Sequence, residues 1–396
     1  MGNAVLSVAT FADDILCLST QSKEGIERQL EIIMRWCKRW NMRLSESKTY
    51  ISTLSEENNW RCENHEGSTM EFQESMMFSY LGLDFHIKGR DFLMDQYKRM
   101  LSKAEKYRHA ILNTTRESLD RSLVAHSLWE SCAVPAIMYG AEACILSEKT
   151  LKNLDEKQRS IAAFITGLSI KGGNTALTVE SGLMPFKARY HIAMHRFFNR
   201  LLKSRSHLIG QALVEHQEGG WSSPYKRRID EIIKLYGLEY MTPKVAIRSI
   251  KEEAWAQVMK EVYSLKSLRY FSSRVEPWML PGHITDSQGS AVLSRFRTGN
   301  AGLGNRAPLQ NRDRMKDCPL CKEKSRKRRL NEEHIVLQCP ELRSVHRHLG
   351  FETFWMKYGR NSLYKYLGGD KCTDEELLRR GSKLDDLLSQ YLERVA

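Results

Sequence analysis

The chain has 396 residues, of which 41% are hydrophobic and 28% are charged, a composition typical of folded proteins and unlike that of disordered chains. At roughly 150 residues per domain, this length favours two or three domains and excludes a single small disulfide-stapled module. Lys and Arg total 61 against 48 Asp and Glu, which gives a formal charge of +13. This excess favours phosphate-rich partners, so nucleic acid is the leading partner class.

The cysteine content and the hydropathy indicate the cellular compartment in which the protein works. Nine cysteines in so long a chain are too few for a disulfide framework, and three of them cluster near the C-terminus, a pattern that suggests metal binding in a reducing compartment. No apolar run reaches the roughly 18 residues needed to cross a bilayer, and the N-terminus lacks a signal-peptide pattern. We therefore expect an intracellular protein that does not engage a membrane.

The N-terminal segment predicts a hairpin that carries two acids at its turn. The apolar run over residues 5–18 is broken by Asp13 and Asp14, as expected for two strands joined by a turn. After Ser22, which suits a helix N-cap, apolar residues recur at steps of three and four up to Trp40. This spacing predicts an amphipathic helix.

Helical patterns dominate the rest of the chain. Residues 49–54 predict a short strand, residues 55–69 a polar loop, and residues 78–87 a strand or tight hairpin. From about residue 91 the strand signals nearly vanish. The pattern predicts helices over residues 119–129, 151–164, 187–202 and 228–236, and Pro135 marks a break between the first two. A connector is expected over residues 204–224, and a mixed region ends at residue 299.

Adjacent carboxylates between two apolar runs predict a cation site. Desolvating a carboxylate costs several kcal/mol unless a cation compensates. In two-metal phosphoryl transfer, carboxylates on neighbouring strands hold two Mg²⁺ ions, which activate a 3′-hydroxyl and stabilise the leaving pyrophosphate. Because solvated Asp-Asp turns are common, the tetrapeptide alone leaves that alternative open.

Phe11-Ala12-Asp13-Asp14 resembles the Y/F-x-D-D box of reverse transcriptases, in the Ala-containing form of LINE-type (non-LTR) retrotransposons. Further segments resemble this family in the expected order: Trp36 to Met42 with Ser47-Lys48-Thr49 (palm), Tyr80 to Leu83 (primer grip), Val134 to Glu142 (thumb), and Glu180 to Pro185 with Arg295 to Gly299 (after the thumb). Singly each is weak, and their order is what makes the resemblance specific.

The resemblance implies an α+β chain with an RNA-directed DNA polymerase activity, RNA template and DNA primer or target DNA as partners, and residence in nucleus and cytoplasm. Asp13 and Asp14 would hold Mg²⁺, and Lys48 would assist pyrophosphate departure as a proton donor. The implied domains are the C-terminal part of a palm of antiparallel strands plus helix (1–90), a helical thumb (91–205), a connector (206–305), a zinc knuckle (306–350) and a helical tail (351–396).

One departure from the family matters. Its palm needs a further metal-binding Asp and a fingers region upstream of the box, whereas Met1 lies ten residues before Phe11. We therefore expect a C-terminal portion of a larger polyprotein, whose upstream part is a partner, and no polymerisation by this chain alone; sustained Mg²⁺-dependent primer extension would refute that expectation. The alternative is a catalytically dead relic that acts as a zinc-dependent nucleic-acid-binding protein.

A second constellation, C-x2-C-x12-H-x4-C, is formed by Cys318, Cys321, His334 and Cys339. Zn²⁺ takes four nitrogen or sulfur ligands tetrahedrally, and this spacing supplies them in two pairs. The loop between the pairs carries a basic run, Arg326, Lys327, Arg328 and Arg329. If zinc holds the two ends of this loop together, the loop could bind phosphate backbones or single-stranded nucleic acid. A nuclear localisation signal or a solvated surface explains the four basic residues equally well.

Two weaker patterns remain, of which the first leaves two alternatives open. Arg and aromatic residues interleave over residues 189–200, which fits either a nucleic-acid channel or core aromatics beside a solvated basic face. The scattered Cys17, Cys37, Cys132 and Cys144 read as buried core thiols.

Overall fold

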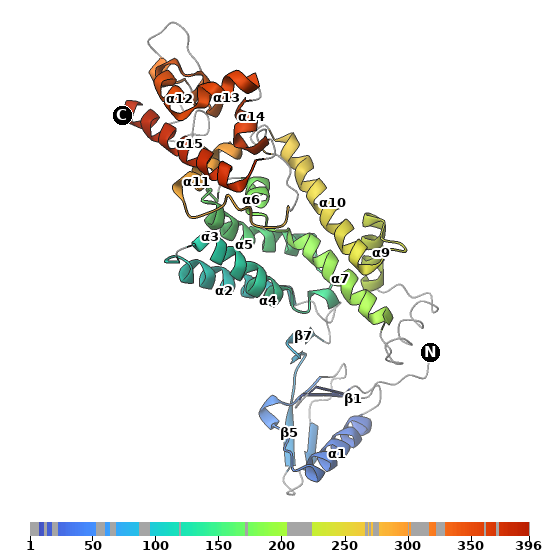
Figure 1. Ribbon diagram of the computed structural model, residues 1–396. Helices are drawn as coiled ribbons and strands as arrows, with labels where there is room; N and C mark the ends of the chain where they lie inside the picture. The colour runs from blue at the N-terminus through green and yellow to red at the C-terminus, as the bar shows by residue number, and fades with distance from the viewer. Residues whose placement is uncertain are drawn as a thin grey trace. The chain divides into compact units, whose positions relative to one another are not determined.

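In the computed structural model, the chain forms two compact units. Unit 1 comprises residues 1–100, 138–147 and 192–243, and unit 2 comprises residues 101–137, 148–191 and 244–396. Helices make up most of the described part (Figure 1). The structure describes residues 8–11, 14–17, 23–52, 60–63, 69–86, 96–118, 120–170, 173–203, 224–265, 268, 271, 277–299, 301, 317–321, 329–359, 362–369 and 372–395.

Unit 1 opens with the predicted hairpin. Strand β1 (Val8–Phe11) pairs antiparallel with β2 (Asp14–Cys17), and Phe11 lies opposite Asp14. The predicted amphipathic helix is confirmed as α1 (Lys23–Arg39), which buries Leu30, Met34 and Cys37. Trp40, expected on the apolar face, is 62% exposed because the helix has ended one residue earlier. Ser22, the expected N-cap, lies outside the described residues.

A small three-stranded sheet follows α1, in the order β3-β5-β4. After the short 3₁₀ turn η1 (Glu46–Lys48), β3 (Tyr50–Ile51) runs parallel to β5 (Thr69–Glu74), and β4 (Trp60–Glu63) pairs antiparallel with β5. The loop expected over residues 55–69 is therefore wrong at β4. The register pairs Trp60 with Phe72, twelve residues away. The residues around Trp60 are polar, so the local sequence pattern does not predict a strand there.

The hairpin expected over residues 78–87 is confirmed as β6 (Met77–Tyr80) and β7 (Leu83–His86). Unit 1 is completed by residues 138–147, which include the 3₁₀ turn η3 (Ala141–Ala143), and by α9 (Pro224–Tyr236). Among the described helices, α2 (Gln96–Thr114) and α7 (Phe186–Lys203) have several residues in each unit, and α4 (Val134–Met138) and α10 (Pro243–Ser264) each have one terminal residue in unit 1.

The first part of unit 2 is helical. It contains α3 (Arg121–Leu128), the π-helical turn η2 (Trp129–Ala133), α4 (Val134–Met138), α5 (Glu148–Thr166), α6 (Asn174–Ser181), α10 (Pro243–Ser264) and α11 (Gln288–Arg297). Pro135, expected to break the helix, lies inside α4. The wider π turn just before it accommodates a residue that cannot donate a backbone hydrogen bond.

A buried charge network joins α6 to α11. Glu180 is fully buried and accepts hydrogen bonds from Arg297 Nε at 3.1 Å, Ser294 Oγ at 3.0 Å and His283 Nε2 at 3.1 Å. The two segments expected after the thumb, Glu180 to Pro185 and Arg295 to Gly299, are thus brought into contact. A buried carboxylate needs such partners, because an uncompensated one would be costly.

The C-terminal part of unit 2 packs around its last helix. It consists of η7 (Pro319–Cys321), η8 (His334–Gln338), η9 (Pro340–Leu342), α12 (Arg343–Leu349), α13 (Phe351–Tyr358), α14 (Ser362–Tyr364), η11 (Lys365–Gly369) and α15 (Asp374–Val395). In Figure 1, α15 lies beside α11. Gly289 and Gly381 face one another there, and a Cβ on Gly381 would lie 2.5 Å from the Gly289 carbonyl oxygen. The glycine pair therefore sets how closely the two backbones approach.

Among the described helices, none combines the length and the apolar character needed to span a membrane.

Candidate metal centre and polymerase motif

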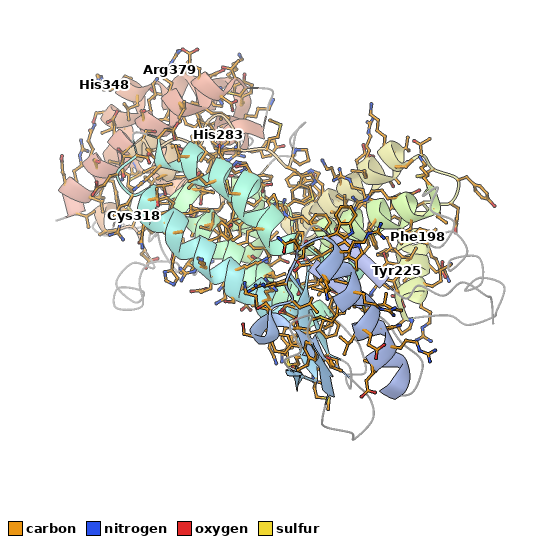
Figure 2. All side chains as sticks on the ribbon, turned by 90° about the horizontal axis from the view of Figure 1, so that it is seen from below. Phe198, Tyr225, His283, Cys318, His348 and Arg379 are labelled. Atoms are coloured by element: carbon orange, nitrogen blue, oxygen red, sulfur yellow. The ribbon has the colours of Figure 1, made fainter. Side chains whose placement is uncertain are left out.

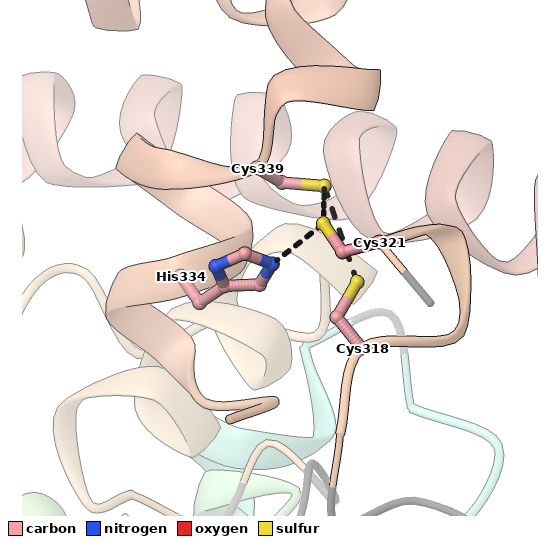
Figure 3. Close-up of side chains that lie close together, drawn as sticks. All are labelled: Cys318, Cys321, His334 and Cys339. Carbon is pink, nitrogen blue, oxygen red and sulfur yellow. Dashed lines mark hydrogen bonds between the residues drawn. The ribbon is translucent and has the colours of Figure 1, made fainter. Parts of the chain in front are cut away.

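The four residues of the C-x2-C-x12-H-x4-C pattern converge on one point. Cys318 directly precedes η7, Cys321 is the last residue of η7, His334 begins η8, and Cys339 follows η8. All four are buried, and their ligand atoms lie within 4.8 Å of one another. Figure 3 shows the four side chains pointing toward a common centre. The structure therefore brings together, as a compact group, every residue that the spacing singled out.

The distances fit a tetrahedral zinc ion. Cys321 Sγ lies 3.8 Å from Cys339 Sγ and 3.5 Å from His334 Nε2, and Cys318 Sγ lies 4.0 Å from Cys339 Sγ. Two sulfur atoms that are each about 2.3 Å from a tetrahedral ion lie about 3.8 Å apart, and a sulfur and an imidazole nitrogen lie slightly closer. The residues present thus match zinc in donor chemistry and in spacing.

The electrostatics of the thiols also call for a cation. The hydrogen bond from Cys339 lowers the pKa of Cys318 to about 4, whereas the same contact with Cys318, together with burial, raises the pKa of Cys339. Because sulfur atoms this close repel one another as anions, only some of them ionise without a compensating charge. A divalent ion would allow all three thiolates to form together.

The three cysteines pack into a larger hydrophobic core that includes helices as well as loops. They belong to the same buried cluster as Phe296 of α11 and Leu384, Leu387 and Tyr391 of α15. This contribution of α15 to the core around the cysteines is not predicted by the sequence pattern. The available signal was the apolar spacing of 384, 387 and 391, which marks one helix face but does not say what that face covers.

The loop between the two ligand pairs is closed at its base. Asp317 and Arg329 form an antiparallel β-bridge immediately outside the first cysteine pair and before His334. Arg329 is exposed there, whereas Arg326, Lys327 and Arg328 lie outside the described residues. The described base of the basic loop therefore lies next to Cys318, the first residue of the cluster.

Neighbouring histidines do not join the cluster. His346 hydrogen-bonds through Nε2 to the Ile335 carbonyl at 2.6 Å, and burial lowers its pKa. His348 is exposed, and in Figure 2 it lies well apart from Cys318. His334 Nδ1 is buried and has no hydrogen-bond partner among the residues that the structure describes, although a ligating imidazole usually donates this second N–H to an acceptor.

The proposed polymerase residues occupy unit 1. Asp14 is exposed at the start of β2, directly after the hairpin turn, and Asp13 lies outside the described residues. Lys48 is exposed at the end of η1. No hydrogen bond or ion pair joins Asp14 to Lys48, both of which the structure describes. The exposed Asp14 is accessible to a hydrated Mg²⁺ ion.

The two weaker patterns resolve in part. Tyr190, His195 and Phe198 of α7 are buried, which favours core aromatics over a nucleic-acid channel at these positions. Among the scattered cysteines, Cys37 and Cys144 are buried as expected, Cys17 is half-buried, and Cys132 is exposed, so the core-thiol prediction is wrong for Cys132.

Comparison with known proteins bears on the N-terminal region. Residues 3–85 match the family model described as reverse transcriptase (RNA-dependent DNA polymerase). The match covers β1 through most of β7, including the Asp-Asp hairpin and the β6–β7 hairpin. Comparisons with curated proteins and with solved structures gave no significant match. The chain is therefore similar to reverse transcriptases over its N-terminal region.

Proposed function

We propose that this chain is the reverse-transcriptase portion of a LINE-type retrotransposon polyprotein, and that the full-length parent is an RNA-directed DNA polymerase that copies element RNA at a nicked DNA target. The family match over residues 3–85 carries the proposal. The ordered motifs that follow it, the charge of +13 and the cysteine–histidine centre support it. In this function the protein would occupy both cytoplasm and nucleus.

The proposed chemistry assigns two roles to three residues. Asp13 and Asp14 would hold Mg²⁺ at the β1–β2 turn, together with a carboxylate from the upstream part of the polyprotein. When bound there, Mg²⁺ would supply the Lewis acidity that activates a primer 3′-hydroxyl and the charge that neutralises a leaving pyrophosphate. Lys48 would donate a proton to that pyrophosphate.

Recognition of a primer–template tests this proposal independently of synthesis. The measurement is the affinity of the full chain for an RNA template annealed to a recessed DNA primer and for the same RNA single-stranded, with and without Mg²⁺. We expect about tenfold tighter binding of the primer–template in Mg²⁺. The double variant Asp13→Asn, Asp14→Asn should lose the Mg²⁺-dependent part alone, because it removes the two carboxylates that we propose hold the ion.

The alternative is a catalytically dead relic that binds nucleic acid through its zinc centre. The buried Cys318, Cys321, His334 and Cys339 group favours it, since that site is complete within this chain. Equal binding of single-stranded RNA and primer–template, with no response to Mg²⁺, would support this alternative and contradict the polymerase proposal.

The zinc centre itself has a direct test. The purified full chain should contain one Zn²⁺, and Cys318→Ser should remove it, because three ligands hold the ion far less tightly than four. Cys132→Ser is the matched control, since Cys132 is exposed and outside the cluster. Metal content measured by mass spectrometry decides the assignment, and a zinc-free wild-type chain would exclude it.

A further inference from the structure

The turn between β6 and β7 has a strained backbone. Leu81 has φ +48° and Gly82 has φ +75°, and Tyr80 pairs with Leu83 across the turn. A two-residue hairpin turn with positive φ at both central residues is of type I′, which glycine adopts readily and leucine does not. Such strain persists only where the surroundings hold it in place, and it concentrates at functional sites.

Tyr139 holds this turn from a distant part of the sequence. Its hydroxyl donates a 2.7 Å hydrogen bond to the Leu81 carbonyl, and its ring lies close enough that a Cβ on Gly82 would be 3.4 Å from Cε1. The Tyr139 carbonyl in turn accepts a 3.2 Å hydrogen bond from Nε2 of the buried Gln96. The Tyr139 backbone is therefore held by Gln96, and its side chain contacts the Leu81–Gly82 turn.

Two further contacts bind the same hairpin. Gly140 has φ +78°, and a Cβ there would lie 2.1 Å from Leu83 Cδ2, so only glycine lets the chain after Tyr139 approach the hairpin this closely. Arg99 of α2 donates to Asp84 of β7 at 3.1 Å. Tyr139 and Gly140, which belong to the segment resembling the thumb signature, thus contact the segment resembling the primer grip within unit 1.

We propose that Tyr139 is a positioning residue that holds the Leu81–Gly82 backbone in the orientation in which this turn meets a DNA primer strand, an inference that rests on the proposed polymerase function. Tyr139 is 50% exposed, so its hydroxyl bond orders a surface turn and does not complete a buried core. The hydrogen bond from the Tyr139 hydroxyl restricts the backbone motion of the strained Leu81–Gly82 turn. Deleting the hydroxyl should release the turn and leave the fold intact.

The experiment compares Tyr139→Phe with a matched control in the full chain. Tyr50→Phe also deletes an exposed phenol that donates to a backbone carbonyl in unit 1, here Ser47 at 3.3 Å, but across only three residues. The readouts are hydrogen–deuterium exchange of residues 77–86 and the dissociation constants for a recessed primer–template and for single-stranded RNA.

A typical hydrogen bond corresponds to about a fivefold change in an equilibrium constant. Tyr139→Phe should therefore raise exchange of the hairpin and the dissociation constant for the primer–template about fivefold each. Binding of single-stranded RNA should stay unchanged, and Tyr50→Phe should change none of the three.

Two results would overturn the inference. Unchanged hairpin exchange would show that the hydroxyl does not hold the turn, and faster exchange with unchanged primer–template affinity would make Tyr139 a structural residue only. Failure of the underlying function is seen separately, because a wild-type chain that does not distinguish primer–template from single-stranded RNA would fail before any variant is compared, and would overturn both.

Discussion

At the scale of single residues, Asp155 shows how burial tunes a carboxyl group. Its Oδ1 accepts a 2.9 Å hydrogen bond from the backbone N–H of Phe186, the first residue of α7. Burial nevertheless raises its pKa to about 6, against the lowering effects of this bond and of Arg189. The folded state therefore favours the protonated acid.

This shift fixes the sign of a pH effect. A pKa that is raised in the folded state stabilises the protein fully below the unfolded value near 4, and this stabilisation is lost as pH rises through about 6. Asp155→Asn keeps an oxygen acceptor for Phe186 and cannot ionise. We expect this variant to be more stable than wild type at pH 7.5 by on the order of 1–3 kcal/mol, with no advantage at pH 4.

Urea unfolding at the two pH values measures the difference. Asp286→Asn is not equivalent, because the Asp286 carboxylate pairs with Arg121, so a loss of stability is expected there. A constant Asp155→Asn effect across the pH range would contradict the assigned pKa.

At the scale of elements, the approach of α11 and α15 depends on two glycines. The C-terminal core, including the cysteines of the metal centre, lies between these helices and the segments around η7 and η8. A small displacement of α15 therefore changes the packing behind the proposed zinc ligands. Packing and metal geometry are coupled at this point because protein interiors are close-packed.

Gly381→Ala tests this coupling. The added Cβ would lie 2.5 Å from the Gly289 carbonyl oxygen, so the helices must separate. We expect a loss of about 1–3 kcal/mol in the free energy of unfolding and faster removal of zinc by a chelator. The adjacent, exposed Ser382→Ala is the control and should change stability by less than about 0.5 kcal/mol. Equal zinc release from both variants would show that the helix contact does not support the metal centre.

At the scale of the whole molecule, the net charge predicts how nucleic acid is bound. Residues 306–348 hold 12 Lys and Arg against 6 Asp and Glu, an excess of 6 out of the total of 13. Phosphate contacts release counterions, so affinity falls with salt at a slope set by the number of contacts. The basic run from Arg326 to Arg329 is the densest local source of such contacts.

Replacing Arg326, Lys327, Arg328 and Arg329 with Gln should flatten the log–log salt dependence of single-strand binding by about 3, at roughly 0.7 per lost phosphate contact. The control replaces Arg248 and Arg379, which are exposed and paired with Glu252 and Glu375. Fluorescence anisotropy between 50 and 300 mM salt, roughly the range over which such slopes are read, supplies the measurement. An unchanged slope would show that these four basic residues do not contact the phosphates.

Local patterns in the sequence determined much of this protein. The apolar run broken by Asp13-Asp14 predicted the β1–β2 hairpin, three- and four-residue spacing predicted α1, and C-x2-C-x12-H-x4-C identified the four residues that converge. These features depend on neighbours in the chain or on ligand chemistry, so they are legible without a fold.

Only the tertiary structure decided the rest. The pairing of Trp60 with Phe72, the grip of Tyr139 on Leu81 and the packing of α15 behind the cysteines join residues far apart in the sequence. Each arises because burial and hydrogen bonding are satisfied across space, and no single-chain spacing records which distant partner meets the requirement.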